Sequence, residues 1–187
     1  MAFAAVYDAC VLYPAPLRDL LLRLAVRGLF RAHWSAQILE ESFRNILANR
    51  PDLSIKALER TRRLMNEAVP SAMVTGHEKL AGSVVLPDPD DRHVVAAAIR
   101  AGAQVVVTFN LDDFPSDALA EFEVVAQHPD DFVLNLIDLA PGVVCDVVRE
   151  QAASLKSPAR TVADLLDTLT RQGLLQSVAR LRELLVV

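Results

Sequence analysis

Carboxylates follow two short apolar runs of this chain. The first run, residues 4–7, ends on Asp8, and the second, residues 105–108, leads into Asn110, Asp112 and Asp113. A third acidic group, at residues 87–91, precedes a helical pattern. Apolar β-branched runs bounded by turn residues predict buried strands, and ligand sites in open α/β sheets gather beyond the carboxyl ends of such strands. These acids are therefore candidates for one shared site.

Separate carboxylates of this kind suit a hard cation. Without His or Cys companions, converging Asp and Glu oxygens favour Mg²⁺ or Mn²⁺ over zinc. Such an ion binds a phosphodiester, lowers the pKa of water and stabilises the departing oxygen, so that acids and metal suffice for hydrolysis. Cys10, which follows the first apolar run, is interpreted as a small apolar filler. The four histidines show no ligand spacing and are interpreted as surface or packing residues: His33, His77, His93 and His128.

The helix predicted from Asp88 to Ala101 gives the sharpest local indication. At about 100° per residue, Asp91 falls within the apolar stripe of this helix, which is formed by Val94, Val95, Ala98 and Ile99. A carboxylate on a buried face is costly unless it has partners, which favours a ligand or partnered role for Asp91. Asp88 is followed by proline and is more typical of a helix cap. Asp8 has the alternative of accepting backbone hydrogen bonds in a turn, as aspartate often does.

In the helix predicted after Ser35, the periodicity of apolar residues does not decide between two glutamates. Ser35 is typical of the N-cap of a helix that continues to Asn49. The apolar face of this helix is flanked by both Glu40 and Glu41. The helical wheel therefore does not decide which of these two glutamates turns inward.

Charge is unevenly spread along the chain. The formal net charge is −5, yet residues 44–63 are rich in arginine, and no Lys or Arg occurs from residue 101 to residue 148. A basic helical segment facing an acidic centre suits a metal-dependent enzyme that acts on a phosphate backbone. Two solvated faces are the ordinary alternative. For contact with the polymer we consider five cations: Arg44, Arg60, Arg62, Arg63 and Arg92.

Two kinds of pattern divide the chain. Up to residue 128, strands alternate with helices over short links, which predicts an α/β fold with a mostly parallel sheet. These strands are expected at residues 3–7, 30–34, 72–75, 105–108 and 122–125. Beyond residue 128 the β-runs disappear, and leucine-rich helical patterns follow at 130–140, 142–156, 161–172 and 174–186. We expect an α/β domain at residues 1–128 and an all-helical C-terminal extension at residues 129–187.

Properties of the whole chain narrow the class of protein. A chain of 187 residues, of which 52% are hydrophobic, can bury a sizeable core. Its two cysteines have no pair spacing, which fits a reducing compartment. No apolar stretch approaches the about 18 residues of a membrane span, and the first residues lack the basic region of a secretory leader. The sequence thus predicts a soluble, cytoplasmic protein that does not bind a membrane.

Four segments together resemble the PIN domain, the nuclease module of many prokaryotic VapBC-type toxins. They are residues 6–12, 35–41, 88–96 and 107–114, which read VYDACVL, SAQILEE, DPDDRHVVA and VTFNLDDF. The likeness covers residues 3–128, and four pieces in order at domain-scale separations are fairly specific. The resemblance implies a three-layer α/β/α fold, divalent-metal-dependent ribonuclease activity, and a metal site formed by Asp8, Glu41, Asp91 and Asp113.

The resemblance also favours particular residues where the helical pattern left two glutamates open. The family pattern places its glutamate three residues after the isoleucine of the second segment, which favours Glu41 over its neighbour. Many relatives carry an aspartate two residues after the threonine, whereas this chain has Asn110 there. The fourth carboxylate is therefore expected from Asp113 or Asp112. Asn110 is then expected to orient a metal-bound water, and Thr108 to support the cluster by hydrogen bonding.

Two hypotheses about function follow. The leading one is an endoribonuclease that uses Mg²⁺ or Mn²⁺ and acts as the toxin of a type II toxin–antitoxin pair, with RNA as substrate and a cognate antitoxin as partner. The alternative is a catalytically silent PIN-like binding module that acts through protein or RNA interaction, and uptake of Mg²⁺ or Mn²⁺ distinguishes the two. The leucine-rich faces of the extension suit packing within the chain, a homodimer or antitoxin docking.

Overall fold

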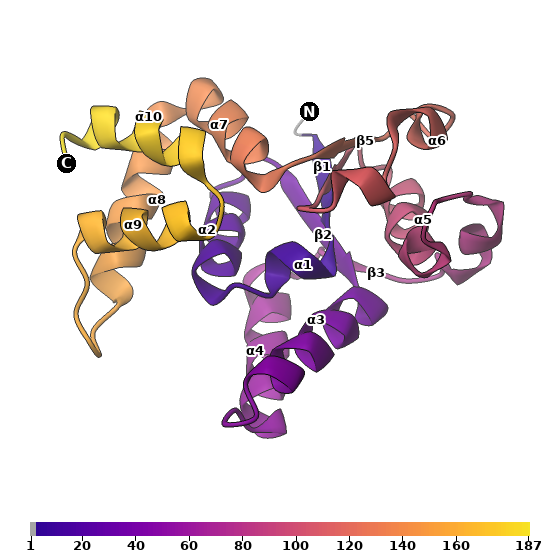
Figure 1. Ribbon diagram of the computed structural model, residues 1–187, viewed down its shortest axis with the longest axis horizontal. Helices are drawn as coiled ribbons and strands as arrows, with labels where there is room; N and C mark the ends of the chain where they lie inside the picture. Colours follow the sequence, from indigo (N-terminus) through magenta and orange to yellow (C-terminus); the bar gives the residue numbers. More distant parts are fainter. Residues whose placement is uncertain (1–2) are drawn as a thin grey trace.

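A five-stranded sheet forms the centre of the structure, a computed structural model that describes residues 3–187. The described strands all pair in parallel, in the order β3-β2-β1-β4-β5 (Figure 1). They are β1 (Ala4–Tyr7), β2 (Arg31–Ser35), β3 (Met73–Val74), β4 (Val105–Val107) and β5 (Val125–Gln127). Because the strands run in the same direction, their carboxyl ends meet at one edge of the sheet.

Helices connect these strands and form the C-terminal region. Between the strands lie α1 (Ala9–Leu12), α2 (Ala15–Val26), α3 (Ala36–Asn49), α4 (Ile55–Ala68), α5 (Arg92–Ala101) and α6 (Ser116–Ala120). After β5 follow α7 (Pro129–Leu139), α8 (Pro141–Ser154), α9 (Val162–Arg171) and α10 (Leu175–Leu185). Short 3₁₀ helices complete the connections: η1 (Glu78–Ser83), η2 (Pro89–Asp91) and η3 (Leu111–Asp113).

β1 lies at the centre of the sheet because its residues are apolar on both faces. All four are fully buried, and the strand pairs with β2 on one side and β4 on the other. A continuous apolar run is typical of a parallel strand that is covered on both faces. Tyr7 at its end stacks on the buried ring of Trp34, with ring centroids 6.2 Å apart. The next residue, Asp8, therefore stands at the carboxyl edge above a rigid core.

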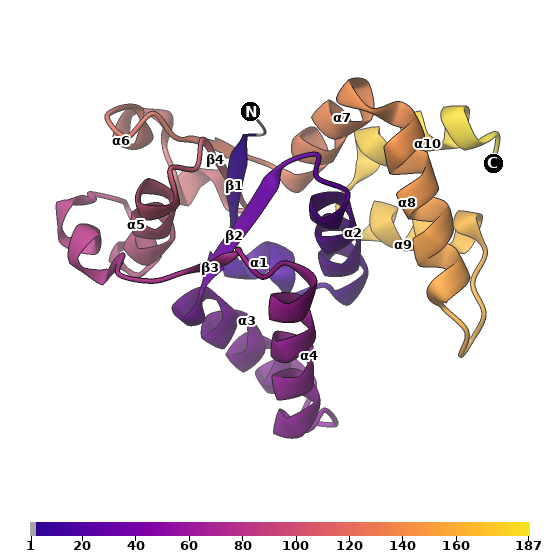
Figure 2. The ribbon, with the colours of Figure 1, turned by 180° about the vertical axis from the view of Figure 1, so that it is seen from behind.

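Helices cover both faces of the sheet (Figures 1 and 2). α5 packs across β1, β2, β3 and β4 on one face, while α2 and α7 lie on the other. On this second face the Tyr7 hydroxyl donates to the carbonyl oxygen of Leu21 in α2 (3.1 Å). The ring of Phe132 in α7 meets that of Phe30 edge-on, with centroids 5.0 Å apart. The predicted three-layer α/β/α architecture is confirmed.

Two predicted elements differ from the structure. The strand expected at residues 122–125 begins only at Val125 and continues to Gln127. The preceding apolar residues form a turn instead, in which Glu123 has a positive φ of 55° and the buried Val124 donates its N–H to the carbonyl of Leu119 (3.4 Å). The helix expected from residue 88 begins as the 3₁₀ helix η2 and becomes α-helical only at Arg92.

The C-terminal helices pack on one another and on α2. Their bounds agree with the four helical patterns that the sequence predicted, so the all-helical nature of this region is confirmed. A buried carboxylate, Asp130 in the first turn of α7, accepts hydrogen bonds from Gln176 and Ser177 at the start of α10. Among the described residues, no helix is both long enough and apolar enough to cross a membrane.

Candidate metal centre

Asp8 is the most deeply buried carboxylate at the carboxyl edge of the sheet, with 3% of its surface exposed. Its Oδ1 accepts the backbone N–H of Ala9 at 2.6 Å. Its Oδ2 accepts the hydroxyl of Thr108 at 2.7 Å and the thiol of Cys10 at 2.9 Å. Burial raises the pKa of Asp8 and the charge of Glu41 adds to this, whereas the hydrogen bonds from Cys10 and Thr108 act in the opposite direction. The carboxylate is thus fixed in orientation and close to another acid.

Thr108 joins the ends of β1 and β4. It is fully buried, and its hydroxyl donates to Asp8 while accepting the backbone N–H of Asn110 at 3.0 Å. This geometry follows from the register of the sheet, in which Tyr7 and Val107 lie side by side. The side chain of Asn110 is exposed and makes no hydrogen bond with the residues that the structure describes.

The pKa of Asp91 indicates that several carboxylates lie close to one another. It is half-buried at the junction of η2 and α5. Burial raises the pKa of its carboxyl group to about 7, and the negative charges of four other acids add to this: Asp8, Asp113, Asp88 and Glu41. These acids come from separate segments of the chain, which the fold brings within range of mutual repulsion. Asp88 also caps η2, since its Oδ1 accepts the N–H of Asp90 at 2.8 Å, as its sequence context predicted.

The two glutamates of α3 differ in exposure and in their partners. Glu40 is exposed and lies 3.9 Å from Arg62. Glu41 is half-buried, and its Oε2 lies 3.2 Å from Nε2 of His93 in α5. Together with its effects on Asp8 and Asp91, this contact places Glu41 on the side of the acids.

The two aspartates of η3 also differ. Asp113 is half-buried and is one of the charges that raise the pKa of Asp91. Asp112 is exposed and is not among the charges that act on Asp91. The structure therefore brings Asp113 closer to the cluster than its neighbour.

Two residues of this site were not recognised in the sequence as more than packing residues. His93 is 6% exposed and contacts Glu41, and Cys10 contacts Asp8. The contact of Cys10 with Asp8 is local, because the two residues are two positions apart, whereas the contact between Glu41 and His93 has no local signal. Glu41 and His93 are 52 residues apart, and Thr108, the other side-chain donor to Asp8, is 100 residues from it. The pairing of β1 with β4 brings Thr108 to Asp8, and the packing of α3 beside α5 brings His93 to Glu41.

A cleft of about 430 Å³ opens beside the acids. Carboxylates dominate its lining, which consists of Gln37, Glu40, Glu41, Arg44, Asp88, Asp90, Asp91 and His93. As placed, no three His, Cys, Asp or Glu side chains of the described residues are close enough to hold one metal ion.

The donor set nevertheless fits a hard divalent cation. It consists of carboxylate oxygens, which Mg²⁺ and Mn²⁺ prefer. A cation would also relieve the repulsion that raises the pKa of Asp91. Asp8, Glu41, Asp91 and Asp113 are the residues that would hold it.

The five candidate arginines divide into two groups. Arg44 lines the acidic cleft, and Arg92 lines a second cleft of about 350 Å³ that shares Gln37, Asp90 and His93 with the first. The other three lie on α4. There Arg62 lies over the ring of Phe43 and Arg63 pairs with Glu67 at 3.6 Å, while Arg60 is exposed. Of the five, Arg44 and Arg92 are therefore the ones that line these two clefts, while Arg62 reaches the cleft residue Glu40 at 3.9 Å.

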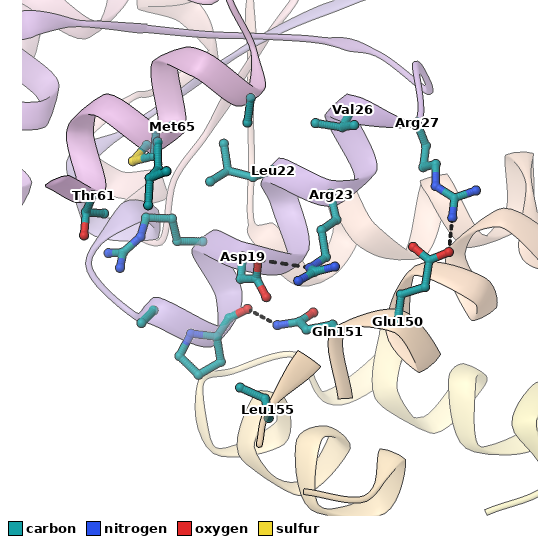
Figure 3. Close-up of a pocket in the computed structure, with 15 residues that line it drawn as sticks. Asp19, Leu22, Arg23, Val26, Arg27, Thr61, Met65, Glu150, Gln151 and Leu155 are labelled. Carbon is teal, nitrogen blue, oxygen red and sulfur yellow. Dashed lines mark hydrogen bonds and ion pairs between the residues drawn. The ribbon is translucent and has the colours of Figure 1, made fainter. Parts of the chain in front are cut away.

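A larger and more apolar pocket lies between α2, α4 and α8 (Figure 3). Its volume is about 570 Å³, and its lining contains none of the acids described above. Charged residues at its rim neutralise one another: Arg23 pairs with Asp19 at 3.0 Å, and Arg27 pairs with Glu150. The larger pocket is therefore not the candidate site for catalysis, because several carboxylates that line the smaller cleft have no cationic partner among the described residues.

Known protein families match both parts of the chain. The sequence profile described as PIN domain matches residues 4–112, which includes Asp8, Glu41 and Asp91, and the profile described as VapC50 C-terminal domain matches residues 129–183. A relative from Mycobacterium tuberculosis, named "Putative ribonuclease VapC50", is 44% identical over 82 residues, which are 44% of this chain and 48% of that protein. The matched region thus spans about half the length of this curated relative. No solved structure matches the chain.

Proposed function

Because the chain belongs to the PIN-domain family, we propose that it is a divalent-metal-dependent endoribonuclease and the toxin of a type II toxin–antitoxin pair. Two similarities support this proposal. The relative from Mycobacterium tuberculosis is named as a ribonuclease, and the C-terminal helices match a domain that takes its name from the same protein. Residues 1–128 would form the nuclease domain and residues 129–187 its helical extension.

One observation carries the proposal. Burial raises the pKa of Asp91 to about 7, and the charges of acids from separate elements of the fold add to this rise. Such an arrangement is unfavourable for the fold by itself, and perturbed carboxylates gathered at a cleft are typical of functional sites. Bound Mg²⁺ or Mn²⁺ would supply a Lewis acid for the phosphate oxygens and lower the pKa of water.

The residues of the chain would divide the remaining work. Asp8, Glu41, Asp91 and Asp113 would hold the cation, and Thr108 would keep Asp8 in its orientation through the 2.7 Å hydrogen bond. Asn110 would orient the water that attacks phosphorus, because its free amide lies beside the same strand end. Hydrolysis then adds this water to phosphorus and breaks one P–O bond of the RNA chain. The guanidinium groups of Arg44 and Arg92 would hold neighbouring phosphates.

Cleavage of total RNA tests the activity directly. The purified protein is incubated with RNA and Mn²⁺ beside Asp91→Asn, which keeps the side-chain size and removes the charge. We expect the cleavage rate of Asp91→Asn to fall by at least about 100-fold, which is more than the effect typical of groups that only support metal ligands. Asp138→Asn, at an exposed position of α7, is the matched control and should cleave as the wild type does. Equal cleavage by Asp91→Asn and the wild type would remove Asp91 from the site.

Metal titration separates this proposal from the alternative of a silent binding module. Calorimetric titration of the wild type with Mn²⁺ should show uptake at or below millimolar concentration, and Asp91→Asn should weaken it. No uptake by the folded wild type would favour a binding module.

Partners are proposed on the same basis. A cognate antitoxin would neutralise the nuclease, and its gene is expected as a small reading frame directly upstream that encodes a DNA-binding protein. Co-expression of both frames with a tag on the antitoxin should retain this chain on the affinity column. Light scattering of the purified chain alone tests the expectation of a homodimer.

A further inference from the structure

Cys10 makes contacts that a simple apolar filler would not make. Its Sγ donates to Oδ2 of Asp8 at 2.9 Å and accepts the backbone N–H of Phe109 at 3.3 Å. Cys10 lies in α1, directly after β1, whereas Phe109 follows β4 and is 99 residues away in the sequence. The thiol therefore ties together the carboxyl ends of two neighbouring strands.

The hydrogen bonds at Asp8 occupy its two oxygens unequally. Oδ2 accepts from two side chains, Cys10 and Thr108, while Oδ1 accepts only from the backbone of Ala9. A carboxylate offers about four acceptor positions, two on each oxygen. Oδ2 is therefore filled, and Oδ1 keeps a free lone pair. Rotation of the carboxyl group would break both side-chain hydrogen bonds, so these donors determine which oxygen stays available.

We propose that Cys10 is a positioning residue for the metal centre: its thiol, with Thr108, holds Oδ2 of Asp8 and so presents Oδ1 to the cation. This inference rests on the proposed function. Cys10 acts through Asp8 and is not itself a ligand, because its proton is directed at the carboxylate. Groups that orient metal ligands in this way typically contribute about 10- to 100-fold in metal affinity.

Four variants separate hydrogen bonding from packing. Cys10→Ser retains a donor, Cys10→Ala removes the donor and volume, and Cys10→Val removes the donor while keeping an apolar side chain of similar size. Cys145→Ala is the matched control, because Cys145 is the other cysteine of the chain and is buried in α8. Mn²⁺ alone is the probe, and its dissociation constant is measured by titration calorimetry after circular dichroism has established that each variant is folded.

We expect Cys10→Ala and Cys10→Val to bind Mn²⁺ about 10-fold more weakly, and Cys10→Ser and Cys145→Ala to bind it as the wild type does. RNA cleavage by the two donor-free variants should fall at limiting Mn²⁺ and recover in excess Mn²⁺. Unchanged Mn²⁺ affinity in a folded donor-free variant would overturn the inference and leave the nuclease proposal standing. If Mn²⁺ affinity falls as much in Cys10→Ser as in Cys10→Val, the shape of the side chain matters rather than its donor. That result would also overturn the inference. Failure of the wild type to bind Mn²⁺ would remove both proposals.

Discussion

Two carboxylates of this protein, Asp8 and Asp130, are almost equally buried and accept equally many hydrogen bonds, but their donors and the charges near them differ. Asp8 is 3% exposed and Asp130 is 4% exposed, and each accepts three hydrogen bonds from protein groups through its carboxylate oxygens. At Asp130 the donors all come from the start of α10: the N–H of Gln176 at 2.8 Å, the N–H of Ser177 at 2.8 Å, and the Ser177 hydroxyl. At Asp8 the donors come from the ends of two strands, and other acids stand nearby.

The difference shows that burial and hydrogen bonding alone do not mark a reactive carboxylate. Asp130 satisfies N–H groups that the first turn of α10 leaves without partners, and its negative charge suits the positive end of the helix dipole. This arrangement is complete as it stands. Asp8 keeps a free lone pair and faces the charge of Glu41, which a cation would neutralise. We therefore expect Asp130 to serve stability and Asp8 to serve catalysis.

The largest expected effect separates these two roles by activity. Asp8→Asn should lower RNA cleavage by at least about 100-fold, because the substitution removes a ligand rather than a group that supports one. Asp130→Asn should leave the cleavage rate per folded molecule within about twofold, because its partners belong to α10 and not to the acid cluster. Rates are measured with RNA in excess Mn²⁺ and are normalised to the folded fraction. A comparable loss in both variants would show that the comparison is wrong.

The second effect, on the free energy of unfolding, should be larger for the substitution of Asp130 than for that of Asp8. Asp130→Ala should lower the free energy of unfolding by about 2–3 kcal/mol, because it leaves the buried donors of Ser177 and the part-buried N–H of Gln176 without an acceptor. Asp8→Asn should change the stability of the metal-free protein by less than that, since it also removes a repelling charge. Urea unfolding in the presence of EDTA measures both. Asp138→Ala, at an exposed position of the same helix as Asp130, should stay within about 0.5 kcal/mol of the wild type.

A third effect depends on pH. The pKa of Asp91 in the folded protein is about 7, which is above the value of about 3.9 for an unfolded chain. The folded state therefore holds the proton more tightly, and its contribution to stability is present below about pH 4 and is lost as the pH rises to about 7. In metal-free urea unfolding, Asp91→Asn should match the wild type at pH 4 and be about 1 kcal/mol more stable at pH 8, a value reduced because Asp91 is partly exposed. Equal pH profiles for both proteins would mean that neither burial nor the nearby acids raise the pKa of Asp91 in the folded protein.

The strand ends could be read from the sequence because their signals are local. Asp8 follows an apolar run that only a buried strand accommodates, and Ser35 caps α3 as its context predicted, with Oγ accepting the N–H of Ile38 at 3.2 Å. The helical pattern predicted from residue 88 put Asp91 on its apolar stripe and so indicated an inward-facing carboxylate, and the structure has Asp91 half-buried at the end of η2.

Contacts between distant segments could not be read in this way. The helical wheel of α3 left Glu40 and Glu41 equivalent, and the difference between them comes from His93 of α5, which is 52 residues beyond Glu41. Asp113 and Asp130 belong to the same acidic stretch, yet one joins the cluster and the other caps α10. Their roles depend on what packs against them, and composition does not contain that information.

The smallest expected effect concerns the approach of RNA to the acid cluster. Arg44 lines the acidic cleft, whereas Arg182 belongs to the C-terminal helices and pairs with Asp167 at 2.6 Å. Each phosphate contact made by a cation adds about 0.7–1 to the slope of log affinity against log salt concentration. In the inactive Asp91→Asn background, Arg44→Gln should lower this slope by about that amount, and Arg182→Gln should leave it unchanged. Fluorescence anisotropy with single-stranded RNA at several salt concentrations measures the slopes. An equal decrease in both variants would mean that RNA lies across the C-terminal helices as well, so the extension would then share in binding the substrate.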